Sequence, residues 1–220
     1  MSTRVKDNVV PDLQHPLWAL ALKCLIDRIV SATVLMLVWP ILLMIALAVW
    51  LSSPGPIFYK GIRSGLHGQP FRILKFRTMV TDAELLGGPT TGSTDPRVTP
   101  VGWFLRRAKL DELPQFFNVL KGDMSLVGPR PEVLEYTSRY QGEERLILAM
   151  KPGITDYASI EFADLGDRVG SHDPDAYFRQ HILPRKNALR LKYVREWSTT
   201  TDFQILVHTF VRVLQRIYRS

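Results

Sequence analysis

The sequence predicts a mostly helical α/β fold of the α+β kind, with an apolar N-terminal helix before a small polar domain. Residues 29–51 contain no charged side chain, and residues 71–77 alternate between apolar and polar side chains as a strand does. Later segments repeat apolar side chains with helical spacing. We expect two parts: residues 1–56 with the apolar helix, and residues 57–220, a polar domain with amphipathic helices at its C-terminus.

The apolar run from Ile29 to Leu51 is long enough to cross a hydrocarbon core of about 30 Å, because a helix rises ~1.5 Å per residue. It begins too far along the chain, and lacks the small-residue cleavage pattern, for a signal peptide. Three interpretations remain open: a single-pass anchor, a re-entrant helical hairpin and an unusually apolar core helix. Pro40 lies near the middle of the run, where a proline bends or breaks a helix.

Basic side chains flank the apolar run on both sides. Lys23 and Arg28 precede it, and Lys60 and Arg63 follow it. Since lysine and arginine favour the cytoplasmic side of a membrane, these flanks favour a hairpin that breaks at Pro40 and returns both ends to one leaflet. The side after the run is the more basic, so we expect the polar domain in the cytoplasm for a hairpin and for a straight span.

Turns and short strands follow the apolar run. Residues 53–56 read Ser-Pro-Gly-Pro, a turn that ends the apolar helix. We expect strands at residues 57–59 and 71–77, with a turn at residues 65–69 between them. Residues 87–96, rich in glycine, threonine and proline, are expected to form a flexible loop.

Two helices come next. Thr99 has the residue type of an N-cap and Pro100 that of a first helical residue. A second helix is predicted by apolar side chains at i, i+3, i+4 and i+7, with Gly122 as its C-terminal stop. We expect its first turn to hold Asp111 and Glu112.

Further elements complete the polar domain. The pattern predicts a strand at residues 154–162, helices at about residues 174–196, and a last, amphipathic helix after Asp202. The apolar face of that helix carries Phe203, Leu206, Val207, Phe210, Val211 and Leu214. Its basic face carries His208, Arg212, Arg216 and Arg219. We expect this helix to pack on the core or to lie on a membrane surface.

The net charge of +7 calls for an anionic partner, which could be a nucleic acid, an acidic lipid surface or a phosphorylated substrate. Aromatic side chains at helical core spacing, without a recognition motif, argue against nucleic acid. The one cysteine, Cys24, excludes a disulfide framework and a cysteine zinc site. The sequence has no Walker A, Rossmann or His-Glu-x-x-His motif.

The adjacent carboxylates Asp111 and Glu112 are the strongest chemical signal. At a helix N-terminus, free N–H groups and the helix dipole stabilise negative charge, so we expect Asp111 to stay ionised and to act as a nucleophile. Neighbouring helical residues point about 100° apart. That angle disfavours an acid–base pair acting across a sugar, and it favours attack by one carboxylate while the other binds a divalent metal. The alternative is that the pair only caps a helix.

Basic side chains accompany these carboxylates in the sequence. The planar guanidinium of arginine suits bidentate contact with phosphate oxygens. Together with the acidic pair and a membrane helix, the group indicates a diphosphate site. It comprises Lys75, Arg77, Arg106 and Arg130, with Pro129 and Pro131 restricting the backbone on either side of Arg130.

Five short sequence blocks follow one another in order within residues 23–155. They read Lys75-Phe76-Arg77-Thr78-Met79, Leu110-Asp111-Glu112-Leu113-Pro114-Gln115, Asn118-Val119-Leu120-Lys121-Gly122-Asp123-Met124-Ser125, Gly128-Pro129-Arg130-Pro131 and Lys151-Pro152-Gly153-Ile154-Thr155. The complete series resembles the signature blocks of the bacterial monotopic phosphoglycosyl transferases, small sugar transferases that initiate glycoconjugate assembly.

This resemblance implies a two-step transfer. The aspartate matching Asp111 attacks the β-phosphorus of a UDP-sugar, UMP leaves, and polyprenyl (undecaprenyl) phosphate then takes the phosphosugar from the enzyme. Glu112 matches a carboxylate associated with Mg²⁺ beside Asp111, while Lys75, Arg106 and Arg130 match charged groups of the phosphate site. The product would start an O-antigen or other lipopolysaccharide, a capsule, an exopolysaccharide or a glycoprotein.

The resemblance also implies a location. It places residues 57–220 as a catalytic domain on the cytoplasmic face of the bacterial inner membrane, with its lipids and no nucleic acid as partners; a homodimer is left open. The family breaks its re-entrant helix at a Ser-Pro pair, where this chain reads Trp39-Pro40. Some members carry a nucleotide-recognising arginine after Pro-Gly-Ile-Thr, which residues 156–163 lack. No sugar-binding residue is therefore transferred.

Three other functions compete with this interpretation. A membrane-anchored scaffold explains the apolar run and the charge, but it does not explain the group from Asp111 to Arg130. A nucleic-acid-binding protein fits the charge alone. A nucleotide-sugar hydrolase would use the same donor, and it differs from a transferase in releasing UMP without polyprenyl phosphate.

Overall fold

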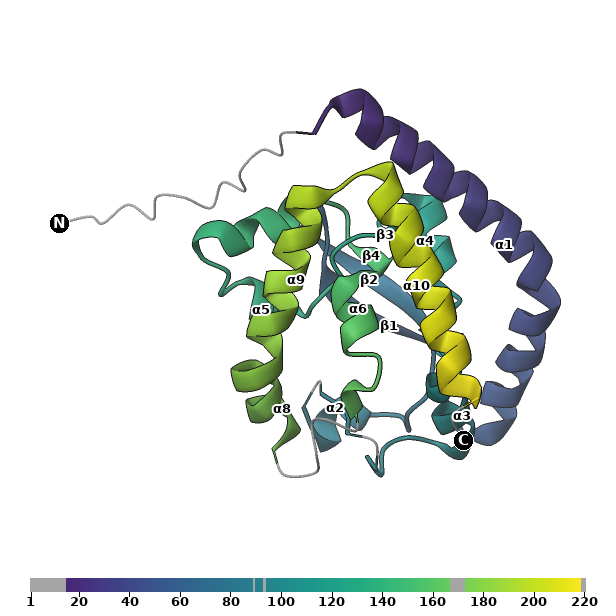
Figure 1. The fold of residues 1–220 in the computed structure, drawn as a ribbon. Helices are drawn as coiled ribbons and strands as arrows, with labels where there is room; N and C mark the ends of the chain where they lie inside the picture. Colours follow the sequence, from purple (N-terminus) through teal and green to yellow (C-terminus); the bar gives the residue numbers. More distant parts are fainter. Residues whose placement is uncertain (1–14, 89, 93, 167–172, 219–220) are drawn as a thin grey trace.

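Two small sheets lie among helices, and one long helix wraps around them (Figure 1). The computed structural model describes residues 15–88, 90–92, 94–166 and 173–218. The elements of the first half are α1 (Leu17–Ser52), β1 (Phe58–Ser64), η1 (Leu66–Gly68), β2 (Pro70–Phe76), α2 (Ala83–Leu86), α3 (Pro100–Arg107), η2 (Leu110–Glu112) and α4 (Gln115–Lys121). Those of the second half are β3 (Ser125–Val127), α5 (Leu134–Thr137), η3 (Gly142–Ala149), β4 (Gly153–Thr155), α6 (Tyr157–Glu161), α8 (Pro174–Tyr177), η4 (Phe178–Ile182), α9 (Leu183–Glu196) and α10 (Thr199–Tyr218).

The helix α1 is continuous through Pro40 and bends along its length (Figure 1). Proline cannot donate the hydrogen bond to the carbonyl four residues earlier, which allows bending without ending the helix. Within the described residues, α1 is the one helix long and apolar enough to cross a membrane. Met36 and Leu37 expose more than 70% of their surface, so α1 is not a buried core helix of this chain.

Two sets of contacts attach α1 to the polar body. Near the helix N-terminus, buried Asp27 accepts a hydrogen bond from Ser125 Oγ at 2.5 Å, and Lys23 pairs with Asp202 at 2.5 Å. Near its C-terminus an apolar cluster joins three elements: Ile45 and Val49 of α1, Phe76 of β2 and Leu105 of α3.

The strands β1 and β2 form an antiparallel hairpin, with the turn at residues 65–69 as predicted. The strand predicted at residues 57–59 is the start of the longer β1. Asn118 of α4 holds β2 in place, because its Oδ1 accepts the Leu74 N–H at 2.9 Å and its Nδ2 donates to the Arg72 carbonyl at 2.8 Å. These two bonds tie α4 to the strand that carries Lys75.

Both predicted helices after the loop are present. Thr99 caps α3 by accepting the Gly102 N–H at 2.9 Å, and Gly122, with φ +95°, ends α4. The acidic pair, however, does not lie in the first turn of α4 as expected. It forms the separate 3₁₀ helix η2, since Pro114 has no N–H to bond the Leu110 carbonyl in α-helical fashion.

The strands β3 and β4 pair in parallel, with Ser125 opposite Gly153. Their ends approach so closely that a Cβ on Gly153 would lie 2.0 Å from the Gly128 nitrogen. The predicted strand over residues 154–162 is wrong beyond Thr155. Asp156 accepts the Ser159 N–H at 2.6 Å and thereby caps α6, which takes over the rest of that segment.

The C-terminal helices agree with the predicted ranges, since α8, η4 and α9 cover residues 174–196 and α10 follows. Two positions were expected for the apolar face of α10, and the prediction that it packs on the core is wrong, because Phe203 and Phe210 are 67% and 64% exposed. Among the described side chains of α10, Ile205 is buried. Of the predicted basic face, Arg219 and the side chain of Arg216 lie outside the described residues.

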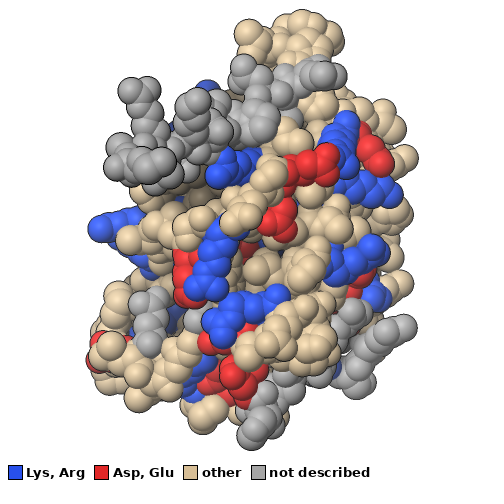
Figure 2. Space-filling model, turned by 90° about the vertical axis from the view of Figure 1, so that its left-hand side faces the viewer, with Lys and Arg blue, Asp and Glu red and all other residues tan. Residues whose placement is uncertain are grey.

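The face shown in Figure 2 carries lysine and arginine side chains interleaved with aspartate and glutamate, rather than one continuous basic surface. The exposed ion pairs of the chain include Arg185 with Glu161 at 2.9 Å and Arg139 with Glu135 at 3.0 Å. Such pairs contribute little to stability.

Candidate active site

Three segments meet at the carboxylate of Glu112. Lys75 of β2 donates to Glu112 Oε1 at 3.0 Å, and the guanidinium of Arg130, in the loop after β3, donates to the same oxygen. All three side chains are largely buried. The structure therefore brings together three residues that the sequence analysis singled out from positions 75, 112 and 130.

The loop that carries Arg130 is held by β4. The Arg130 N–H donates to Asp156 Oδ2 at 2.9 Å, and its guanidinium also donates to the Ile154 carbonyl at 2.8 Å. The Pro129 carbonyl accepts the Gly153 N–H at 3.1 Å, while Pro131 restricts the backbone on the other side. The orientation of Arg130 thus depends on the contact between β3 and β4.

The turn that holds the two carboxylates is anchored in an apolar cluster shared by α1, β2 and α3. Leu110 and Leu113, which flank the acidic pair, pack against the apolar cluster that contains Ile45 and Val49. Lys109 precedes the turn in a left-handed conformation, φ +58°, and separates it from α3. The acidic pair therefore lies between two leucines that pack on the cluster to which α1 contributes.

Asp111 differs from its neighbour. It is 6% exposed, and its Oδ1 has no hydrogen-bond partner among the residues that the structure describes. Gln115, one turn later, is fully buried, and neither polar atom of its amide has a partner within the same described ranges. Buried polar groups of this kind are costly unless something binds them, so this corner has spare capacity for a ligand.

Electrostatics separate the two carboxylates. Burial alone would raise the pKa of Glu112, yet Arg130, then Lys75 and Lys109, hold it well below its usual value. Burial and the neighbouring Glu112 charge raise the pKa of Asp111. These effects oppose the stabilisation of the Asp111 charge that was expected from a helix N-terminus, because Asp111 lies buried in a 3₁₀ turn.

Arg106 and Arg77 have different surroundings. Arg106 Nε donates to Thr78 Oγ1 at 2.8 Å; burial lowers the pKa of Arg106, and the Asp111 charge is the strongest influence in the opposite direction. Arg77 instead donates to the carbonyls of Pro54 and Ser53 at 2.5 and 2.7 Å. Arg106 therefore lies in the electrostatic surroundings of Asp111, whereas Arg77 binds the backbone just after the end of α1.

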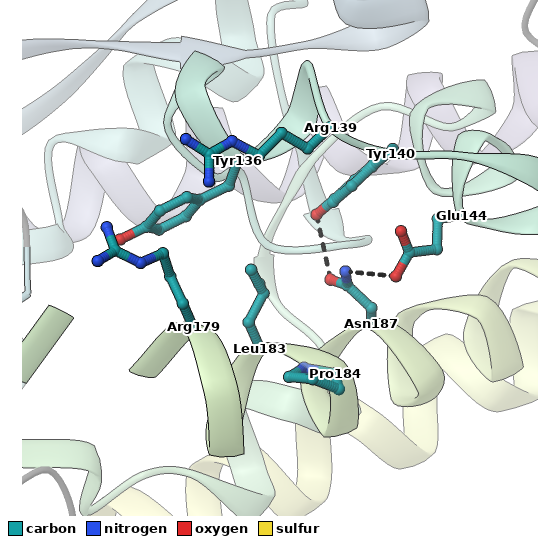
Figure 3. Close-up of a pocket in the computed structure, with 8 residues that line it drawn as sticks. All are labelled: Tyr136, Arg139, Tyr140, Glu144, Arg179, Leu183, Pro184 and Asn187. Carbon is teal, nitrogen blue, oxygen red and sulfur yellow. Dashed lines mark hydrogen bonds between the residues drawn. The ribbon is translucent and has the colours of Figure 1, made fainter. Parts of the chain in front are cut away.

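A cavity of about 210 Å³ lies elsewhere, and none of the predicted site residues lines it (Figure 3). Tyr136 and Arg179 lie at one end in this view, and Tyr140, Glu144 and Asn187 at the other. Asn187 accepts a hydrogen bond from Tyr140 at 3.1 Å and donates one to Glu144 at 3.0 Å, so these three polar side chains of the cavity wall are bonded to one another.

Sequence reasoning missed the uncharged and indirect members of the site. Asn118 and Gln115 carry no charge, although both lie inside the blocks that resemble the transferases. Asp156 lies in a segment predicted as strand, where the available signal was a helix cap: an aspartate three residues before Ser159. Within the described part of the chain, no three His, Cys, Asp or Glu side chains cluster closely enough to hold a metal by themselves.

Comparison with known proteins identifies the family. A model of the bacterial sugar transferases matches residues 18–216. The chain belongs to the bacterial sugar transferase family. Within this family, it is similar to proteins named UDP-glucose:undecaprenyl-phosphate glucose-1-phosphate transferase from Xanthomonas campestris pv. campestris (41% identity), Escherichia coli K12 (42%) and Caulobacter vibrioides (38%).

These alignments cover most of this bacterial sugar transferase chain, but they cover only part of the length of each relative. They span 87%, 91% and 87% of this chain. The same alignments span 38% of the Xanthomonas protein, 42% of the Escherichia coli protein and 69% of the Caulobacter protein. The chain therefore corresponds to about two fifths of the length of the first two relatives.

We expect the stabilising effect of the Glu112 ion pairs to depend on pH. Pairing lowers the folded-state pKa of Glu112 below its ordinary value of 4.5, so the pairs stabilise the fold above about pH 4.5 and lose this effect as the pH falls through the lowered pKa. Glu112→Gln should lower the free energy of unfolding by about 2 kcal/mol at neutral pH. Denaturant titrations in detergent should show this difference shrinking in acid.

The matched control for this pH series is Glu135→Gln. Its exposed pair with Arg139 should contribute less than about 1 kcal/mol at any pH. A difference between wild type and Glu112→Gln that stays constant down to about pH 2.5 would contradict the assigned electrostatics.

Proposed function

We propose that the chain transfers a sugar 1-phosphate from a UDP-sugar to undecaprenyl phosphate, releasing UMP and starting the assembly of a bacterial glycoconjugate. The observation that carries the proposal is the buried acidic pair, in which Glu112 is held by Lys75 and Arg130 while Asp111 keeps an unpartnered oxygen. The names of the relatives make UDP-glucose the first donor to test.

In the first step, an oxygen of Asp111 bonds to the β-phosphorus of the donor. The bond from that phosphorus to the bridging oxygen breaks, and UMP leaves with the oxygen and the electron pair. Lys75, Arg106 and Arg130 bind the diphosphate oxygens and stabilise the charge that develops on them. The unpartnered Oδ1 of Asp111 supports the nucleophilic role, because no protein hydrogen bond has to break before attack.

In the second step, the phosphate of undecaprenyl phosphate attacks the phosphorus of the aspartyl phosphosugar. A new phosphorus–oxygen bond forms, the bond to Asp111 breaks, and the carboxylate is restored. The product is an undecaprenyl diphosphate sugar. Dividing the transfer in this way lets one site serve a water-soluble donor and a lipid acceptor in turn.

The acidic pair also fits Mg²⁺ bound together with a diphosphate. Mg²⁺ is usually held by one or two carboxylates, with water and substrate phosphates completing its shell. Asp111 and Glu112 would supply those carboxylates, and the buried Oδ1 of Asp111 has no hydrogen-bond partner to exchange among the described residues. When bound, the metal would neutralise charge on the diphosphate.

We further propose that the apolar helix within residues 1–56 enters the membrane as a re-entrant hairpin and that residues 57–220 form the catalytic domain on the cytoplasmic face. The bend of α1, its Pro40 and the basic residues at both ends support this topology. The exposed apolar face of α10 and the exposed Trp103 and Phe104 of α3 suit contact with the same lipid surface. Arg107 lies 5.2 Å from the Trp103 ring, a pairing common at membrane interfaces.

We predict that Asp111→Asn abolishes transfer without unfolding the protein. Asparagine is nearly isosteric but lacks the nucleophilic charge, so the rate should fall by a factor on the order of 10³ or more. Wild type mixed with UDP-glucose alone should show a phosphosugar on the peptide containing Asp111 by mass spectrometry. The variant should keep its unfolding temperature and form no adduct.

The control is Asp173→Asn, which changes an exposed helix cap to another good cap. The course of UMP release separates the competing functions: a transferase turns over repeatedly only with undecaprenyl phosphate, a hydrolase turns over without it, and a scaffold releases nothing. An active Asp111→Asn enzyme would falsify the mechanism.

Chelation should stop the reaction reversibly. If Asp111 and Glu112 hold Mg²⁺ against the diphosphate, excess EDTA should abolish UMP release, and Mg²⁺ added beyond the chelator should restore it. Full turnover in excess EDTA is the result that rules out this role.

In the proposed topology, both ends of the chain should be reachable only from the cytoplasm. In a Cys24→Ser background, single cysteines at positions 5 and 215 should react with a membrane-impermeant maleimide in permeabilised cells and not in intact spheroplasts. Labelling of position 5 from outside, with position 215 protected, would establish a single-pass anchor and exclude the hairpin.

A further inference from the structure

A fully buried arginine lies in the middle of α9, outside the residues used by the proposed reaction. The side chain of Arg190 has no exposed surface. A charge buried in this way is costly unless partners compensate it. Its stability at this position must therefore depend on the polar groups that surround it.

The three nitrogens of the Arg190 guanidinium face three different side chains. Nη2 donates to Glu132 Oε1 at 2.6 Å, and Nη1 donates to Asn187 Oδ1 at 3.2 Å. Nε lies 3.6 Å from Asp156 Oδ2. Asn187 is itself fixed by Tyr140 and Glu144 at the wall of the cavity in Figure 3.

The two carboxylates that Arg190 engages lie on either side of Arg130. Asp156 accepts the Arg130 N–H at 2.9 Å, and Glu132 follows Arg130 by two residues along the chain. Asp156 is further held by Ser159, whose N–H and hydroxyl both donate to Oδ1 at 2.6 Å. Arg190 therefore links α9 to both sides of the residue that pairs with Glu112.

A second cation balances this group. Lys186, one turn earlier on α9, lies 3.6 Å from Glu132. Despite burial, Arg190 and then Lys186 lower the pKa of Glu132 to about 2. Two acids and two bases thus form a closed ionic group, in which Arg190 alone contacts both acids.

We propose that Arg190 is a positioning residue. Its ion pairs with Asp156 and Glu132 fix the loop around Arg130, so that the Arg130 guanidinium points toward Glu112 and the phosphate site. This inference rests on the proposed function, in which Arg130 binds the donor diphosphate. Lysine in its place would keep the charge but lose the planar fork, so it could serve one carboxylate at a time. The loop at Arg130 would then be less well fixed.

The kinetic test combines Arg190→Lys with Arg130→Lys, using UDP-glucose and undecaprenyl phosphate. Because a displacement of about 1 Å can lower a rate 10²-fold, Arg190→Lys should lower kcat by a factor on the order of 10–100 while KM for UDP-glucose changes little. If Arg190 acts through Arg130, the double variant should match Arg130→Lys alone. Multiplicative losses in the double variant would overturn the inference.

Two further variants guard this kinetic test. Arg185→Lys makes the same substitution on α9 at an exposed pair with Glu161 and should leave kcat unchanged. Glu132→Gln, nearly isosteric, removes one of the charges that Arg190 grips and should reproduce the loss of kcat. It keeps the inference testable if Arg190→Lys fails to fold.

Hydrogen–deuterium exchange of the full chain gives a readout without turnover. Arg190→Lys should speed exchange in the peptide around residues 126–133, which contains the Arg130 N–H, and leave the β1–β2 hairpin unchanged. Unchanged exchange around Arg130 would overturn the inference even if the enzyme is active. A wild-type protein that releases no UMP from any UDP-sugar would contradict the proposed function, whereas the exchange result would still decide the role of Arg190.

Discussion

The site depends on the burial of one carboxylate. Glu112 cannot be buried as an anion unless cations accompany it, and the two that form ion pairs with it come from β2 and from the loop after β3. The hairpin, the 3₁₀ turn and the β3–β4 contact must therefore form together. Any rearrangement that withdraws Lys75 or Arg130 removes part of the compensation for this buried charge. The same requirement concentrates positive charge where a diphosphate would bind.

The neighbouring carboxylate is treated in the opposite way. Asp111 is buried beside an ionised Glu112, and both conditions raise its pKa. Its Oδ1 has no hydrogen-bond partner among the described residues, whereas Glu112 forms ion pairs with Lys75 and Arg130. Adjacent residues of one chain thereby acquire different chemistry. Glu112 is a paired, buried charge, and Asp111 keeps one buried oxygen without a hydrogen bond in the described residues.

Local signals in the sequence predicted much of this fold. The cap at Thr99, the stop at Gly122 and the charges at Lys75, Glu112 and Arg130 all concern single residue types whose physics is local. Two of the failures come from local signals that the apolar pattern does not contain: a missing proline N–H turned the predicted helix start into a 3₁₀ turn, and a capping aspartate ended the predicted strand early. Apolar helical spacing alone could not say whether the face of the last helix meets protein or lipid. Neutral side chains in the site carry no charge that sequence reasoning could notice.

The apolar cluster next to the acidic pair also contains residues of α1. Leu110 and Leu113 sit on either side of the two carboxylates and pack into the cluster that holds Ile45 and Val49 of the apolar helix. Because the cluster also contains Phe76 and Leu105, one set of apolar contacts joins the turn, the hairpin, α3 and α1. A lipid phosphate is confined to a membrane surface, so a catalytic group carried by a mobile loop would meet it rarely. In the reaction proposed above, this cluster would keep the acidic pair near the helix that is apolar enough to enter a membrane, while Lys75 and Arg130 lie on the polar body.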